Sequence, residues 1–297
     1  MTLRIEGVIT ALVTPFVKGQ VDYEGLAQNI AFQIAEGVSG ILPLGTTGET
    51  PTLSEQERAK IIQLAAEQAR GKALLMVGTG SNCTARTIHN TKLAKDLGAD
   101  AALIVTPYYN KPTPEGIFRH YEAISEAVDL PIVVYNIAGR TGVNIETTTM
   151  KRLSSLPNII AVKEASGNIN QIGDVIHEVQ NKHGNFTVVS GDDAMTLPLM
   201  ALGGHGVISV VSNLTPRHIV AMVKAAAKGD YARARLMHFE LLPLFKGAFI
   251  ETNPIPIKAA MQMCGMPAGT CRLPLCELQP AHKEQLRKIL EELGLLK

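Results

Sequence analysis

Short apolar segments recur along this 297-residue chain at a nearly constant interval, and this spacing limits the possible folds more than any other feature. Most of them have the length and the Val, Ile and Leu content of parallel strands buried on both faces, while the first is more mixed. The eight segments begin near Val8, Gly40, Ala73, Ala101, Pro131, Ile159, Phe186 and Gly206.

Helix-like stretches fill the gaps between these segments. They cover Tyr23–Glu36, Glu55–Arg70, Thr84–Leu97, Pro114–Ala127, Thr147–Leu153, Ile169–Asn181, Ala194–Ala201 and Pro216–Ala227. Ser54 stands where a helix N-cap is expected, and Gly37, Gly71 and Gly98 follow stretches that they can end. Eight alternating strand and helix units predict an α/β fold, a (β/α)₈ TIM barrel.

The residues after the eighth unit predict a C-terminal helical extension. Three further stretches look helical, namely Tyr231–Phe245, Ile255–Cys264 and Ala281–Leu293. No internal repeat, low-complexity tract or linker separates the parts. We therefore expect a barrel that carries the active site over residues 1–228 and a helical extension over residues 229–297.

Composition limits the classes of partner. The chain is 46% hydrophobic, with 28 basic and 27 acidic side chains and no long run of one sign, so we expect neither a nucleic-acid nor a membrane partner. Its first residues lack the pattern of a secretory signal, and its early apolar run is too short and interrupted for a membrane helix. The four cysteines match no C-x-x-C pattern, so we expect reduced thiols and a cytoplasmic location.

A lysine and a tyrosine end two neighbouring predicted strands. Lys163 follows Ile159–Val162, and Tyr135 follows Ile132–Val134. Burial disfavours the charged form of a lysine and lowers its pKa, and a free amine attacks ketones to form Schiff bases. Lys163 could instead form a structural pair on the barrel rim, but Glu164 points to the opposite face of the strand. Tyr135 could simply pack its ring, or it could act as a general acid and base beside Lys163.

Other strand ends offer groups that bind carboxylates. The backbone amides of Thr46 and Thr47, in a glycine-flanked turn, could hold a carboxylate, although an ordinary tight turn is the simpler reading. Arg140 follows the fifth strand, and a guanidinium that faces a pocket binds carboxylates in bidentate fashion, although a loop arginine is more often solvated. Together with Lys163, these groups suit a 2-keto acid held as a Schiff base and condensed with a second carboxylate-bearing molecule.

Metal and cofactor chemistry have little support in the sequence. The eight histidines are scattered, and the pair Asp192 and Asp193 has no third oxygen ligand spaced to help bind Mg²⁺. We expect this pair to be solvated or to cap a helix, and we expect no metal. Tyr108 and Tyr109 form an aromatic loop that is more typical of a subunit contact than of chemistry.

These residues resemble the family of pyruvate-dependent aldolases typified by N-acetylneuraminate lyase and dihydrodipicolinate synthase. The resemblance covers nearly the whole chain, from Gly7–Phe16 to Asn253–Lys258. The synthase branch is favoured by the turn Gly45–Glu49, by Arg140-Thr141-Gly142 after Tyr135-Asn136, and by Arg272-Leu273-Pro274.

The resemblance implies a role for each site residue. Lys163 would attack pyruvate, whose carboxylate would rest on the amides of Thr46 and Thr47. The resulting enamine would attack L-aspartate 4-semialdehyde, oriented by Arg140, in a step of lysine (diaminopimelate) biosynthesis.

Proton transfer and assembly follow from the same resemblance. Tyr135 would relay protons through Thr47 to Tyr109, which in this family reaches in from a neighbouring subunit. Backbone groups at Gly191 and Ile208 would line the pocket. The family implies a homotetramer built from two tight dimers, with Tyr109 crossing the tight-dimer interface. It also implies that neither a metal nor an organic cofactor is needed.

The chain departs from the family pattern at two places. Ala138-Gly139 stands where many synthases have Pro-Ser before the arginine. Arg86 stands where members inhibited by lysine carry an acidic residue, and Glu55 and Arg58 stand where histidines are common. A guanidinium would repel the ammonium group of lysine, so we expect weak or absent feedback by lysine.

Two other functions remain open at this point. A related lyase could cleave N-acetylneuraminate or a keto-deoxy sugar acid to release pyruvate, and Arg140 favours the synthase over it. A non-catalytic keto-acid sensor on the same barrel would leave Lys163 without a covalent role.

Overall fold

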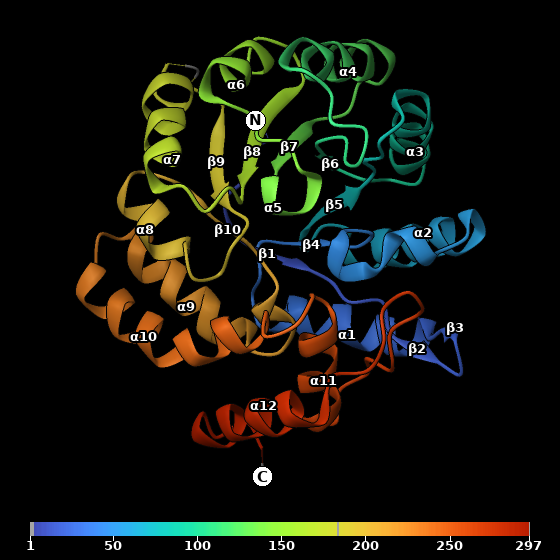
Figure 1. Cartoon of the computed structure of the whole chain (residues 1–297), viewed down its shortest axis with the longest axis vertical. Coiled ribbons are helices and arrows are strands. Elements are labelled where there is room, and N and C mark those ends of the chain that lie inside the picture. Colours follow the sequence, from blue (N-terminus) through green and yellow to red (C-terminus); the bar gives the residue numbers. More distant parts are fainter. Residues whose placement is uncertain (1–2, 183, 297) are drawn as a thin grey trace.

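Eight parallel strands close into a barrel in the computed structural model, which describes residues 3–182 and 184–296. Neighbouring strands around the barrel follow the order β1-β10-β9-β8-β7-β6-β5-β4. Figure 1 shows helices surrounding this barrel, which confirms the predicted TIM-barrel class. The strands are β1 (Gly7–Ala11), β4 (Gly40–Leu42), β5 (Leu74–Gly78), β6 (Ala101–Val105), β7 (Ile132–Asn136), β8 (Ile159–Glu164), β9 (Thr187–Ser190) and β10 (Gly206–Ser209).

All eight predicted strands are present, because their apolar side chains are buried on both faces. Alternate residues fill the barrel interior, including Ile9, Leu42, Leu103 and Val133. The residues between them point outward and pack beneath the helices. The pattern is the one expected of parallel strands that lack a solvated face.

Eight helices cover the outside of the barrel, close to their predicted bounds. They are α1 (Tyr23–Ala35), α2 (Glu55–Ala69), α3 (Thr84–Asp96), α4 (Pro114–Ala127), α6 (Thr147–Leu153), α7 (Ile169–Val175), α8 (Thr196–Ala201) and α9 (Pro216–Ala227). Ser54 caps α2 as predicted, since its side chain accepts from the amide of Glu57 while the Glu57 carboxylate accepts from the amide of Ser54. This reciprocal pair is a capping box.

Several short elements were not predicted. A two-stranded hairpin joins β2 (Phe16–Val17) and β3 (Gln20–Val21), and α5 (Ala138–Thr141) follows β7. Short 3₁₀ turns cover η1 (Thr46–Gly48), η2 (Thr50–Thr52) and η4 (Val211–Asn213), and the helix predicted to Asn181 ends in a π turn, η3 (Ile176–Gln180). Segments this short carry too few residues to show a hydrophobic period.

The C-terminal extension consists of α10 (Tyr231–Gly247), α11 (Ile255–Met263) and α12 (Pro280–Glu292), as predicted. In Figure 1 these orange and red helices lie together on one side of the barrel, with α10 beside α9. Buried side chains of α10, α11 and α12 belong to the same apolar cluster as residues of β1 and α1. The extension is therefore packed against the barrel.

Candidate active site

Lys163 and Tyr135 lie side by side at the carboxyl ends of β8 and β7. The two residues are register partners across these parallel strands, so their side chains project from the same face. The Lys163 Nζ atom lies 4.2 Å from the centre of the Tyr135 ring. The structure thus brings together the amine and the phenol that the sequence placed at two strand ends.

Burial sets the protonation of both groups. Lys163 is only 5% exposed, and desolvation lowers the pKa of its amine to about 7, against the opposing charge of Asp193. The nearby charge of Arg140 lowers the same pKa further. Burial also raises the pKa of Tyr135 to about 12, so its phenol keeps its proton near neutral pH. A free amine beside a protonated phenol can both attack a ketone and supply a proton to the departing oxygen.

Glu164 does not pair with Lys163, as the alternation of strand residues predicts. Its carboxylate accepts from the backbone amide of Ser166 at 2.7 Å and from the Asn136 side chain at 3.3 Å. Asn136 is the register partner of Glu164, so these two side chains share the face that points away from Lys163. The structural alternative for Lys163, a pair with its neighbouring carboxylate, is therefore wrong.

A cavity of about 400 Å³ opens beside Lys163 and Tyr135. Most of the residues proposed for the site line it, namely Thr46, Thr47, Tyr135, Arg140, Lys163 and Gly191. Ile208 is not among the lining residues; it is buried in the barrel interior, and Val210, two residues later, lines the cavity instead. The strand ends thus surround one volume of the size expected for a small-molecule site.

Gly191 permits a close approach of β9 to the lysine. A Cβ atom at this position would lie 3.0 Å from Lys163 Cε and 2.8 Å from the Cβ atom of Ala165. A side chain there would press on Ala165 and Lys163, so the close approach favours glycine.

Two residues of the turn after β4, Thr46 and Thr47, line the cavity. Thr46 and Thr47 begin η1, and the first amides of a helical turn have no acceptor within that turn. Thr47 is buried, and its hydroxyl oxygen accepts from the side-chain amide of Asn253 at 3.0 Å. These amides can bind a carboxylate oxygen in the cavity.

Arg140 lies on α5, at the cavity wall. Its Nη2 atom donates to the backbone carbonyl of Asn253 at 3.3 Å, and its side chain forms no ion pair with any carboxylate in the described part of the chain. A guanidinium with remaining donors is suited to bind a carboxylate of a ligand.

Asp192 and Asp193 differ from each other. Asp192 accepts from the amide of Ala194, as a capping residue does. Asp193 is buried; it accepts from the Ser209 hydroxyl at 2.5 Å and from the amides of Val210 and Val211. Solvation is therefore wrong for Asp193, which lies in the loop after β9, caps η4 and places a carboxylate near Lys163.

Asn253 was missed as an individual site residue. It lines the cavity, is buried, and contacts both Thr47 and Arg140. In the sequence it stood out only as the first residue of a family-like stretch, because nothing local places it beside residues more than a hundred positions away.

Tyr109 is separate from the cavity within this chain. Tyr109 is 89% exposed, and Tyr108 rather than Tyr109 lines the cavity.

Within residues 3–182 and 184–296, no group of three or more His, Cys, Asp or Glu side chains could hold a metal ion. Over the same residues, no helix has the length and the apolar character needed to cross a membrane.

A closed (β/α)₈ barrel with a buried, low-pKa lysine beside a tyrosine at its strand ends defines a class, the barrel lyases. Comparison with known sequences identifies the family within that class. A model of the Dihydrodipicolinate synthetase family matches residues 4–293, and the chain belongs to this family.

Relatives resemble the chain over its full length. It is 56% identical over 292 residues to the 4-hydroxy-tetrahydrodipicolinate synthase of Protochlamydia amoebophila, covering 98% of this chain and 97% of that one. The structure of dihydrodipicolinate synthase from Thermotoga maritima matches with a TM-score of 0.97 at 44% identity. The match covers 99% of this chain and 100% of that one. That of the chloride-inhibited synthase from Acinetobacter baumannii, complexed with pyruvate, has a TM-score of 0.95 at 41% identity, covering 98% and 100%.

Proposed function

We propose that this protein is a 4-hydroxy-tetrahydrodipicolinate synthase, a lyase that condenses pyruvate with L-aspartate 4-semialdehyde in lysine biosynthesis. The observation that carries the proposal is the buried Lys163 amine, whose pKa is lowered to about 7, at a cavity shared with Tyr135 and Arg140. Membership of the family and the pyruvate complex of the Acinetobacter baumannii relative support the same chemistry.

Pyruvate binds first. Its carboxylate accepts from the amides of Thr46 and Thr47, which places its ketone carbon at the amine of Lys163. The amine adds to this carbon and water leaves, which forms a Schiff base. Loss of a proton from the methyl group then gives the enamine, and Tyr135 supplies and removes the protons of these steps.

The second substrate enters the same cavity with its carboxylate on Arg140. The enamine carbon bonds to the aldehyde carbon, and the aldehyde oxygen takes up a proton. The amine of the semialdehyde then attacks the imine carbon, closes the ring and releases Lys163 as a free amine. No cofactor takes part in this sequence.

A second subunit completes the proton path. Tyr109 is exposed and does not line its own cavity. In the proposed assembly its ring enters the cavity of a neighbouring copy, and protons pass from Tyr135 through Thr47 to Tyr109 of that copy. The assembly is a homotetramer of two tight dimers.

The barrel of residues 1–228 supplies the reacting groups, and the extension of residues 229–297 adds Asn253. Four free thiols, at Cys83, Cys264, Cys271 and Cys276, fit a cytoplasmic enzyme.

Borohydride reduction in the presence of pyruvate tests the proposal. Reduction fixes the Schiff base as a stable adduct, which mass spectrometry should locate on Lys163. Trapping should become faster as pH rises through about 7, because the amine then loses its proton. Lys163→Ala should abolish the adduct, and its absence from the wild-type protein would leave only a keto-acid sensor.

A substrate panel after pyruvate loading then identifies the acceptor. Consumption of aspartate semialdehyde rather than N-acetylmannosamine is expected. Arg140→Ala should leave trapping intact and lower kcat/KM for the semialdehyde by about 10- to 100-fold, since a hydrogen bond to a charged group contributes about 1.5–3 kcal/mol. A variant that loses trapping as well would place Arg140 in the pyruvate step.

A further inference from the structure

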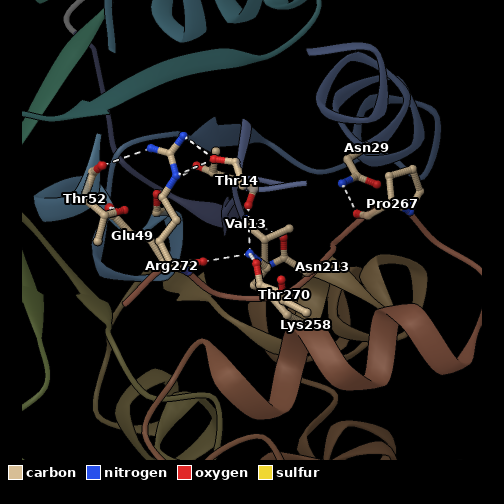
Figure 2. Close-up of polar contacts among 12 residues, drawn as sticks. Val13, Thr14, Asn29, Glu49, Thr52, Asn213, Lys258, Pro267, Thr270 and Arg272 are labelled. Atoms are coloured by element: carbon tan, nitrogen blue, oxygen red, sulfur yellow. Dashed lines mark hydrogen bonds and ion pairs between the residues drawn. The ribbon is translucent and has the colours of Figure 1, made fainter. Parts of the chain in front are cut away.

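A buried ion pair joins the C-terminal extension to the turn that holds Thr46 and Thr47. Lys258 on α11 and Glu49 at the end of η1 approach to 2.7 Å, although 209 residues separate them in the sequence. Their side chains are 1% and 0% exposed. Figure 2 shows Lys258 of α11 together with Thr14 and Glu49, which lie in the segments that follow β1 and β4.

Every donor of the lysine is used. Its amine donates to Glu49 Oε1 at 2.7 Å and to the backbone carbonyls of Thr14 and Thr270, each at 3.1 Å. The other carboxylate oxygen, Glu49 Oε2, accepts from the backbone amide of Arg272 at 2.9 Å. Apolar side chains of equal volume are often at least as stable as a buried ion pair, so one reason to keep such a pair is the single geometry that it specifies.

The backbone of Glu49 needs to be held. Its φ of 53° and ψ of 35° lie in the left-handed region, which costs free energy for a residue with a Cβ atom. Glu49 directly follows η1, and its amide donates to the carbonyl of Thr46. The conformation of Glu49 therefore affects where the amides of Thr46 and Thr47 point.

The same turn is held at two further points. The Thr14 hydroxyl donates to the carbonyl of Gly48 at 2.8 Å, and Thr14 is also an acceptor for Lys258. Asn253, two residues before α11, donates to the hydroxyl of Thr47 at 3.0 Å. The turn is thus linked to the extension at Thr47 and at Glu49, and to the loop after β1 at Gly48.

We propose that Lys258 and Glu49 are positioning residues that set the carboxylate-binding turn Thr46–Thr47, so that the C-terminal extension is a functional part of the active site. The inference rests on the proposed function, because it assigns the turn to the carboxylate of pyruvate. Neither residue touches the substrate in this account. Both act through the direction of the two amides.

Neutral replacements of similar volume test the inference. Lys258→Met removes the three hydrogen bonds, and the double variant Glu49→Leu, Lys258→Met also removes the charge left behind. Both should raise KM for pyruvate by about tenfold or more, because a misdirected turn loses one hydrogen bond from its amides to the carboxylate of pyruvate. At saturating pyruvate, kcat and KM for the semialdehyde should stay within about twofold, because Lys163, Tyr135 and Arg140 are unchanged.

Ile257→Val is the matched control. Ile257 precedes Lys258 on α11 and is fully buried, so its truncation weakens the same packing but keeps the ion pair. It should lower the unfolding temperature without changing KM for pyruvate. Folded Lys258 and Glu49 variants with the wild-type KM for pyruvate would overturn the inference. It would also be overturned if Ile257→Val raised KM for pyruvate as much as these variants do.

Borohydride trapping separates this result from the proposed function. Both variants should still form the adduct on Lys163 at saturating pyruvate, with half-trapping shifted to higher pyruvate concentration. If the wild-type protein forms no adduct, the proposed function fails; if it does and the variants trap at wild-type concentrations, only the role of Lys258 and Glu49 fails.

Discussion

At Lys163, burial favours the uncharged amine and also makes the fold less stable. The pKa of the amine is lowered because the folded protein disfavours its charged form. Between about pH 7 and the ordinary lysine pKa of 10.5, the unfolded chain binds a proton that the folded chain does not. The stability of the folded state therefore rises with pH across this window, and the penalty is fully present below about pH 7.

Replacing the amine with an apolar side chain should remove this penalty. We expect Lys163→Met to raise the free energy of unfolding by about 1–2 kcal/mol at neutral pH, with the gain shrinking as pH approaches the ordinary lysine pKa. Urea unfolding at several pH values measures the difference. Lys288→Met is the control, because this lysine is exposed in the folded protein; an equal gain in the free energy of unfolding there would contradict the role of burial.

Among the elements, local sequence sets the helix ends, and tertiary packing decides the turns at the active site. Helix α2 starts where Ser54 and Glu57 exchange hydrogen bonds, a pattern that lies within four residues. The turn of Thr46–Glu49 is held by Thr14, Asn253 and Lys258, none of which lies near it in the chain.

Ser54→Ala should destabilise the start of α2. The side chain accepts from the amide of Glu57, and loss of an N-cap costs about 1 kcal/mol. Thermal unfolding should show the decrease, while pyruvate trapping stays unchanged. Ser155→Ala is the comparison, since its hydroxyl donates to a carbonyl and caps no amide; an equal loss there would contradict the capping account.

On the scale of the whole molecule, the cavity of a single chain lacks one residue of the proposed site, Tyr109. Tyr109 is 89% exposed and does not line the cavity of its own barrel. Exposed aromatic side chains are enriched in subunit interfaces. The proposed tetramer provides the missing phenol and buries this ring.

Two variants of Tyr109 separate assembly from chemistry. Tyr109→Phe should keep a particle four times the 31.9 kDa chain mass and lower kcat by at least about tenfold through loss of the hydroxyl. Tyr109→Ala should also shift the mass toward smaller species. Light scattering and steady-state kinetics give both values; a wild-type protein that stays a monomer at full activity would contradict the proposed assembly.

Regulation by lysine belongs to the same scale, because it depends on charges beside the active-site cavity. Arg58 and Arg86 line this cavity and form no ion pair in the described part of the chain, whereas Glu55 lies outside the lining and pairs with His89. We expect their charge to repel the ammonium group of lysine, so feedback should be weak or absent. Titration of lysine at fixed substrate tests this, and strong inhibition at sub-millimolar lysine would contradict it.

The sequence by itself determined the eight strands, the helices around them and the two residues proposed to carry the chemistry. A strand that is buried on both faces requires a continuous apolar run, and a helix that is buried on one face requires apolar residues with a 3.6-residue period. Both patterns can be recognised in a short stretch of sequence. Lys163 and Tyr135 could be found because a polar residue at the end of such a run stands out.

Only the tertiary structure decided which distant residues complete the site. The burial of Asp193, the contacts of Asn253 and the pair of Glu49 with Lys258 depend on how the closed barrel and the extension pack. The physical reason is that a hydrogen bond or an ion pair between remote residues leaves no periodic trace in the chain, whereas the free energy of burying apolar side chains does.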